Sequence, residues 1–201
     1  MKAYRGAVLS VFLAAGLAMV WGCGNGLDDG SDPSGSIIRV LSVSPDPADA
    51  FTPDIIISEC DTDDTGQVTF EPGITNSYAQ VQMLNDSRPN TPDGQATNSF
   101  VTMSRYRVDF TGINKTVSIP SLDGGGQTVG IVPDGTGTMT VLVMDLPTLE
   151  YIRSHYPSIG TTEGLTLRAS ITVWGKDAFQ ADVSASADTT LVIENYDRCA
   201  N

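Results

Sequence analysis

The segment TLRASITV (residues 166–173) alternates polar and apolar side chains without interruption. A period of two is that of a β-strand with one face on the core and the other in water. Residues 183–193 return on one phase, and we expect the intervening residues 174–177 to turn the chain. The last third of the sequence therefore predicts a long antiparallel hairpin.

Two segments upstream show the same alternation. Residues 78–83 and 105–110 each predict a strand with one face in water. Arg105 and Arg107 lie on that face of the second strand. These two arginines are expected either to balance nearby acids or to clamp a ligand carboxylate. Runs rich in β-branched residues predict further strands over residues 37–44, 55–57, 117–119, 127–132 and 138–144.

Glycine and proline mark the connections between these strands. PDGTG (residues 133–137) predicts a hairpin turn, because proline presets the first turn dihedral and glycine accepts a left-handed one. DGGG (residues 123–126) lacks the lysine and the helix of a phosphate-binding loop, so we expect a flexible turn. The polar stretch 85–98 predicts a surface loop. This loop and residues 121–137 are the predicted contact regions, since binding concentrates on loops of a rigid scaffold.

One segment, residues 147–155, predicts a helix. Asp145 is placed to cap it, Pro147 is tolerated in its first turn, and Leu149 and Ile152 share one face. The sequence therefore combines many predicted strands with a single short helix.

His155, the sole histidine of the chain, lies at the carboxyl end of this helix. A cation is favoured there by the helix dipole, which gives the residue a structural interpretation. Zinc sites built on two or three histidines are excluded, and no Gly-x-Ser-x-Gly nucleophile elbow occurs. A glycosidase needs only two carboxylates, so the sequence does not exclude one.

A short helix before the penultimate strand, followed by a hairpin to the last strand, resembles the closing part of an immunoglobulin-like sandwich over residues 138–194. The resemblance implies an antiparallel β-sandwich of about seven to nine strands. The predicted fold class is thus all-β, with one short helix and a disordered amino-terminal tether.

The amino terminus has the features of a secretory signal. Two basic residues precede an apolar run over residues 7–21, which is too short for a bilayer core that takes about 20 apolar residues to span. The run ends in VWGC (residues 20–23), which resembles the lipobox of bacterial lipoproteins. That resemblance implies cleavage before Cys23, a diacylglycerol on its sulfur and an acyl chain on its amine.

Acylation would decide where the protein is located, because two or more chains make membrane attachment stable. The predicted location is the bacterial cell envelope. The outer membrane is favoured, since Gly24 stands where an Asp signals inner-membrane retention in enteric bacteria. The predicted domains are a signal peptide (1–22), the lipidated Cys with a flexible tether (23–36) and a β-sandwich (37–201). The tether's polar composition cannot support a core, and its average reach is roughly 20 Å.

Acidic residues dominate the charge of the chain. The formal net charge is −13, and it becomes −15 when the signal and its two basic residues are removed. Such a field repels nucleic acid, and nucleic-acid binding is excluded. The predicted partners are the lipid bilayer, through Cys23, and a protein or glycan of the envelope.

Two cysteines remain if Cys23 is acylated. Cys60 and Cys199 are then an even pair in an oxidising compartment, and we expect a disulfide between them. Closing so long a loop contributes about 4 to 5 kcal/mol on the chain-entropy model.

The densest acidic spot is DTDDTG (residues 61–66). Its alternating acids superficially resemble a calcium loop, although Pro72 occupies the place of the bidentate Glu of the helix-loop-helix calcium motif. Two interpretations stay open, a solvated turn and a weak calcium site built from Asp61, Asp63 and Asp64.

These observations favour a non-enzymatic scaffold, adhesive or binding module held at the membrane. No cofactor is expected, apart from calcium at the acidic loop. The alternatives are an envelope glycan hydrolase that uses an Asp pair in a cleft, and a calcium-stabilised adhesion domain.

Overall fold

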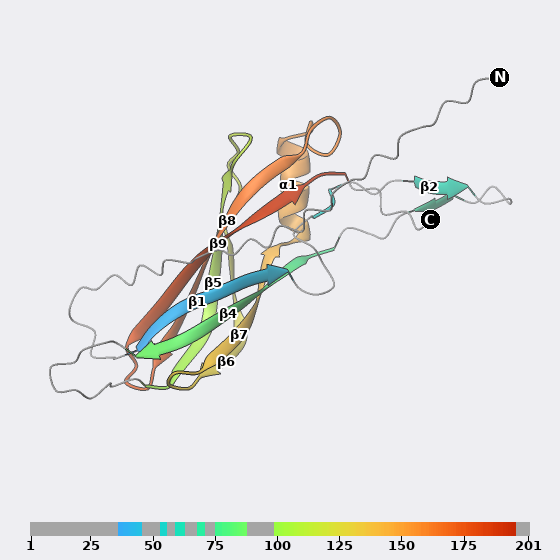
Figure 1. Cartoon of the computed structure of the whole chain (residues 1–201). Coiled ribbons are helices and arrows are strands. Elements are labelled where there is room, and N and C mark those ends of the chain that lie inside the picture. Colours follow the sequence, from blue (N-terminus) through green and yellow to red (C-terminus); the bar gives the residue numbers. More distant parts are fainter. Residues whose placement is uncertain are drawn as a thin grey trace, which may run out of the picture.

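The computed structural model describes residues 36–45, 53–55, 59–62, 68–70, 75–87 and 99–195 (Figure 1). Two antiparallel sheets dominate, one in the order β1-β4-β7 and one in the order β6-β5-β8-β9. The predicted all-β antiparallel sandwich with one short helix is confirmed. The strands of the first sheet are β1 (Ser36–Pro45), β4 (Ser77–Ser87) and β7 (Thr136–Met144), and those of the second are β5 (Val101–Gly112), β6 (Leu122–Ile131), β8 (Leu165–Asp177) and β9 (Asp182–Ile193).

The core lies between the two sheets and is made by the alternating apolar positions of their strands. In β8 every second residue from Leu165 to Val173 is buried, as the alternation predicts. Ala79, Val81 and Met83 of β4 are buried in the same way. The opposing faces supply further apolar side chains, among them Met139, Val141, Val143, Leu191 and Ile193.

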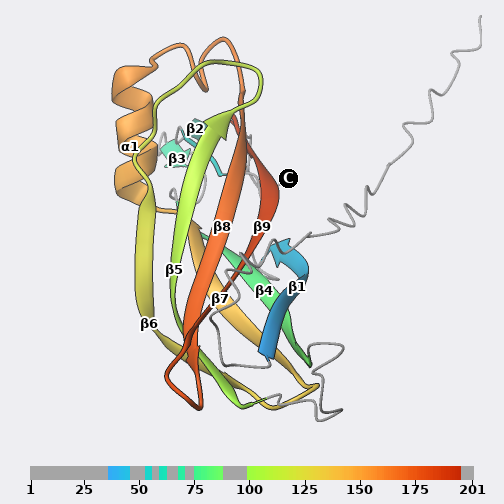
Figure 2. The same cartoon turned by 90° about the vertical axis from the view of Figure 1, so that its left-hand side faces the viewer.

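The molecule has two distinct ends. Figure 2 places α1 (Leu146–His155) at the upper end and the β6–β7 and β8–β9 turns at the lower end. We call the lower end, with residues 36, 99, 132–135 and 178–181, the tether end, because the predicted tether precedes Ser36. The upper end, with α1 and the connections 113–121 and 156–164, is the helix end.

The predicted carboxyl-terminal hairpin is confirmed, with one correction. Strands β8 and β9 pair continuously from Leu165 opposite Ile193 to Lys176 opposite Asp182. The chain turns at residues 178–181 and not at 174–177. Gly175 belongs to the strand because β5 packs against it; a Cβ there would lie 2.1 Å from the Thr102 carbonyl oxygen.

The glycine-rich segment 123–126 was expected to be a flexible turn, and this prediction is wrong. It lies in β6, where residues 122–125 pair with residues 105–108 of β5. Glycine is required at position 124 because the Tyr106 ring crosses the strand there; an added Cβ would lie 2.0 Å from Tyr106 Cζ. The predicted strand at 117–119 is also wrong, since these residues form no strand.

The turn after β6 is present, but the two strands it joins belong to different sheets. It spans residues 132–135, with a hydrogen bond from the Gly135 N–H to the Val132 carbonyl oxygen. Asp134 (φ 55°), rather than glycine, has the left-handed conformation. The predicted hairpin is therefore a crossover from one sheet to the other.

Helix α1 forms as predicted. The Asp145 carboxylate accepts a hydrogen bond of 2.9 Å from the Thr148 N–H, which satisfies one free donor of the first turn. Leu149 and Ile152 are buried against the core. Tyr156 caps the carboxyl end, before Pro157.

The strand predicted for residues 37–44 is confirmed as β1, although Ser36, placed in the tether, is its first residue. Ile55 is buried beside a parallel bridge between Asp54 and Glu194 and is not in a strand; residues 56–57 lie outside the described residues. A separate hairpin joins β2 (Glu59–Thr62) and β3 (Val68–Phe70).

Candidate functional site

Few of the predicted site residues are among those that the structure describes. Cys60 and Asp61 lie in β2, so the acidic segment begins within a strand and not in a turn. Within the described ranges, no three His, Cys, Asp or Glu side chains gather at a potential metal site. The disulfide and the calcium site stay predictions. Outside the described residues lie Cys23, Asp63, Asp64 and Cys199.

A buried polar cluster at the tether end was missed by the sequence reasoning, which placed Asn85 in a surface loop. Asn85 lies in β4 and is fully buried. Its Nδ2 donates hydrogen bonds to the carbonyl oxygens of Ser99 (2.8 Å) and Ile131 (3.2 Å). Its backbone donates to the Gly135 carbonyl oxygen (3.0 Å). Through its side chain and its backbone together, Asn85 of β4 is therefore bonded to the residues next to the start of β5, at the end of β6 and before β7.

Ser36 completes this cluster. Its hydroxyl accepts a hydrogen bond of 3.0 Å from the Ser99 N–H. Ser36 and Ser99 are both buried, so the first residue of β1 is fixed to the residue that leads into β5. The sequence carried a signal for Asn85: it continues the period-two series of buried residues 79, 81 and 83.

The β8–β9 turn at the same end is built on Asp177, which is buried. Its Oδ1 accepts hydrogen bonds of 2.8 Å from the N–H groups of Phe179 and Ala181. The Gln180 N–H donates to the Asp177 carbonyl oxygen, and Lys176 Nζ donates to that of Gln180. These bonds fix the turn in one conformation.

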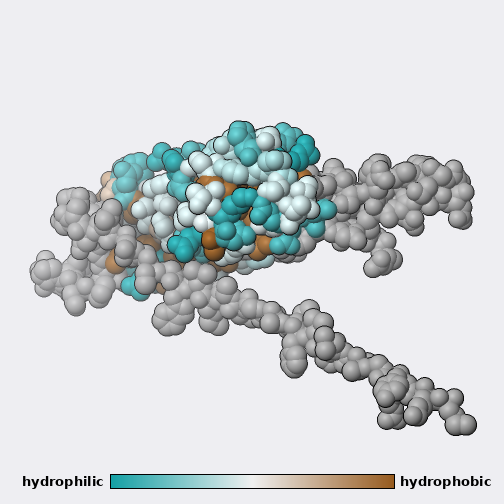
Figure 3. All heavy atoms as spheres, turned by 90° about the horizontal axis from the view of Figure 1, so that it is seen from above, coloured by the Kyte–Doolittle hydropathy of each residue, from teal (hydrophilic) through white to brown (hydrophobic). Residues whose placement is uncertain are grey.

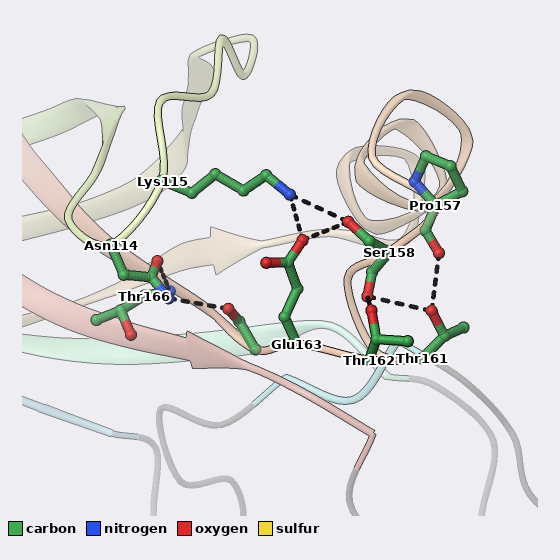
Figure 4. A network of polar contacts seen from close by, with 9 residues as sticks. Asn114, Lys115, Pro157, Ser158, Thr161, Thr162, Glu163 and Thr166 are labelled. Carbon is green, nitrogen blue, oxygen red and sulfur yellow. Dashed lines mark hydrogen bonds and ion pairs between the residues drawn. The ribbon is translucent and has the colours of Figure 1, made fainter.

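The helix end is held together by charged and polar side chains on the surface (Figure 4). Lys115 Nζ donates to Glu163 Oε1 and, at 3.0 Å, to Ser158 Oγ. The Ser158 hydroxyl also donates to Glu163. Asn114 adds two bonds of 2.9 Å, donating to the Gly164 carbonyl oxygen and accepting from the Thr166 N–H. This network ties the β5–β6 connection to the segment before β8.

The Ser158 hydroxyl is bonded to both Lys115 and Glu163, an arrangement in which a serine can be activated as a nucleophile. The hydrogen bonds from Lys115 and Ser158 lower the pKa of Glu163, with the charge of Lys115 acting in the same direction. A carboxylate with a lowered pKa is a weaker general base for a serine hydroxyl. The arrangement therefore fits a structural link between two loops better than an activated serine.

A second surface cluster involves one of the two predicted arginines. Arg107 Nε donates to Asp109 Oδ1 at 2.9 Å, and its guanidinium also donates to Ser121 Oγ. The Ser121 hydroxyl and the Arg107 guanidinium lower the pKa of Asp109. Of the two interpretations of Arg107, the structure favours charge balance, because Asp109 already occupies its guanidinium.

His155 is the last residue of α1, as the sequence predicts, and it is exposed. Its ring stacks on Tyr151 with centroids 4.0 Å apart, and Nδ1 lies 2.9 Å from Ser154 Oγ and 3.0 Å from the Tyr151 carbonyl oxygen. All these contacts are within the last turn of the helix. This geometry agrees with a structural role for His155.

Most hydrophobic residues on the face in Figure 3 form small separate areas within a hydrophilic surface. Of the six large hydrophobic side chains exposed in the described residues, three belong to the tether end: Phe100 (46% exposed), Val132 (57%) and Phe179 (65%). Ile113 and Leu146 are at the helix end, and Leu41 is in β1. Exposed large hydrophobic side chains at one end of a sheet are candidates for a contact surface.

The chain matches no protein-family model, no curated protein and no solved structure in the three comparisons made. Among the described residues, α1 is the one helix, and its 10 residues are too few to cross a bilayer.

Proposed function

We propose that the chain is a lipid-anchored protein of the bacterial cell envelope whose β-sandwich is a non-enzymatic scaffold or binding module. The non-enzymatic part is supported by what the polar side chains of the described residues do, which is to stabilise the fold. At both ends they bond to one another and to the backbone, and they join loops to strands. The space between the sheets is filled by apolar side chains.

The strand order supports an immunoglobulin-like version of the sandwich. Strands β1, β4 and β7 have the arrangement of strands A, B and E of that fold, and β5, β8 and β9 that of C, F and G. Strand β6 pairs with β5, whereas strand D of the constant-type domain lies beside E. Helix α1 lies between the E-like and F-like strands. Such sandwiches present loops from a rigid frame, which suits a binding module.

The lipobox-like sequence ending in Cys23 is the reason for proposing an anchor. Attachment to a membrane confines the sandwich to a thin layer and raises its effective concentration for partners in that layer. The proposed partners are the bilayer itself and a protein or glycan of the envelope, and the proposed membrane is the outer one.

The glycan hydrolase is the second candidate from the sequence, since a glycosidase needs two carboxylates across a cleft. Asp54 and Asp177 are the buried acids among the described residues. Asp177 Oδ1 accepts two hydrogen bonds from the β8–β9 turn, and Asp54 lies in a backbone bridge to Glu194. Neither geometry favours the hydrolase over the binding module.

A pull-down from native envelopes tests the proposed mechanism. The acylated protein and a Cys23→Ser variant, matched for expression and folding, serve as baits. We expect the acylated form to recover envelope neighbours that the variant loses. Recovery of the same neighbours in the same amounts by both baits would contradict a role for membrane confinement.

A further inference from the structure

The tether end presents a group of apolar side chains to solvent. Val101, at the start of β5, pairs with Ile131 of β6 on one side and with Asp177 of β8 on the other. The residues just beyond these pairs are Phe100, Val132 and the turn that carries Phe179. The three exposed side chains therefore belong to adjoining positions at one end of the four-stranded sheet.

Local structure fixes the backbone that carries Phe179 and the place of the Phe100 ring. Phe179 is in the turn fixed by Asp177, where Gln180 has a φ of 67°. Phe100 lies over Gly130, where an added Cβ would approach its Cζ to 2.5 Å. Since the turns are bonded to the body, the backbone that carries Val132 and Phe179 is ordered before binding and loses little conformational freedom.

The position of this end relative to the anchor site is set by Ser36. Ser36 is the first residue of β1 and is bonded to Ser99, the neighbour of Phe100. Twelve residues, 24–35, separate Cys23 from Ser36, and their average reach as a coil is roughly 20 Å. The 13-residue strand β8 is about 43 Å long at about 3.3 Å per residue, and the helix end lies beyond it.

We propose that the tether end is a membrane-contacting surface, in which Phe100, Val132 and Phe179 enter the interface of the bilayer that holds the lipid anchor. This inference rests on the proposed acylation of Cys23. Aromatic rings and aliphatic side chains are favoured at the boundary between headgroups and acyl chains. The contact would orient the sandwich with its helix end away from the membrane.

The charges near this end are the exposed Asp134 of the β6–β7 turn and two pairs of opposite sign. Lys176 pairs with Asp182 at 3.1 Å, and Arg39 pairs with Asp86 at 3.2 Å. Four charges are thus neutralised locally, although the mature chain carries a formal −15. The proposed surface is therefore suited to zwitterionic lipid, and a bilayer rich in anionic lipid would repel the body.

Tryptophan fluorescence can locate each end of the molecule. Cleavage before Cys23 leaves Trp174 as the one tryptophan of the mature chain. Two full-length variants carry Trp174→Phe together with either Phe179→Trp at the tether end or Ile113→Trp at the helix end. Ile113 is a matched control because it is 55% exposed. Both proteins are purified from bacterial membranes and placed in phosphatidylcholine vesicles with brominated acyl chains. Circular dichroism and melting curves verify that both remain folded.

We expect the tryptophan at position 179 to be quenched at least threefold more strongly by brominated lipid than the one at 113, with a blue-shifted emission. Equal quenching at the two positions would overturn the proposal. So would a blue shift at 179 that depends on protein concentration and not on brominated lipid, because it would indicate self-association.

The same samples separate this inference from the proposed function. Intact-mass spectrometry reads the amino terminus of each variant. An acylated Cys23 with an unquenched residue 179 overturns the membrane contact alone. A chain without acyl groups overturns the proposed anchor, and with it the contact.

Discussion

The two ends of the sandwich are fastened by different kinds of interaction. At the tether end, uncharged Asn85, Ser36 and Ser99 are buried and bond to the backbone. At the helix end, Lys115 and Glu163 join two loops at the surface. A buried donor that loses its partner is costly, whereas an exposed ion pair is replaced by water at little cost. We infer that the buried cluster of Asn85, Ser36 and Ser99 holds its end more strongly than Lys115 and Glu163 hold theirs, and that the stability this uncharged cluster contributes is insensitive to pH and salt.

Asn85→Ala should have the largest effect. It removes both side-chain hydrogen bonds to the carbonyl oxygens of Ser99 and Ile131, in a site without access to solvent. We expect the free energy of unfolding to fall by about 2 to 4 kcal/mol in urea titrations. Gln82→Ala, on the exposed face of the same strand, is the control and should change it by less than about 0.5 kcal/mol. Similar values for both variants would show that the buried hydrogen bonds of Asn85 do not strengthen the tether end.

Gly124→Ala tests the middle of the sandwich, where the sheets are joined. The Tyr106 ring must move to make room, and its hydroxyl then loses the bond of 3.3 Å from the Leu142 N–H of β7. We expect a loss of about 1 to 3 kcal/mol in the same titration, as for overpacked sites. Gly125→Ala is the neighbouring control, because its nearest contact would be at 3.3 Å. An equal cost at 124 and 125 would mean that the Tyr106 contact is not the cause.

Gln180→Gly sharpens the description of the β8–β9 turn. A non-glycine residue with a φ of 67° is strained, so glycine should raise stability by about 0.5 to 1 kcal/mol. Ala181→Gly, one residue later and without a positive φ, should lower stability because it adds freedom to the unfolded chain. Thermal melting distinguishes the two signs. A loss of stability in both variants would show that the turn is not strained.

Glu163→Gln should have the smallest effect and the clearest pH dependence. The pKa of Glu163 is lowered from its ordinary value of 4.5 in the folded state, so the carboxylate stabilises the fold at neutral pH. That contribution is lost as the pH falls through the lowered pKa. We expect the stability difference between wild type and variant to shrink below about pH 4.5 and in high salt. The Asn85→Ala difference should stay constant, and a parallel pH trend in both would contradict the comparison.

The strands that alternate strictly could be predicted from the sequence, because burial on one face imposes a period of two. β4, β8 and β9 are of this kind, and so is the capped helix α1. The glycines of β6 could not be predicted, since their place in a strand depends on the ring of Tyr106 from β5. No local signal reports such a contact between strands.

Among the polar sites, too, some have a sequence signal and others have none. Asn85 follows the alternation of β4 and could have been placed in the core, but its amide character favours a loop. The link between Lys115 and Glu163 joins residues 48 positions apart and has no sequence motif. Cys23 depends on a short motif alone, and the fold does not bear on it.

The anchor is the central claim, and the intact mass of the mature protein from bacterial membranes tests it most directly. We predict a chain that begins at Cys23 and carries the added mass of a diacylglycerol and an amide-linked acyl chain, both lost in Cys23→Ser. A mature chain without lipid, or one that retains residues 1–22, would contradict the account.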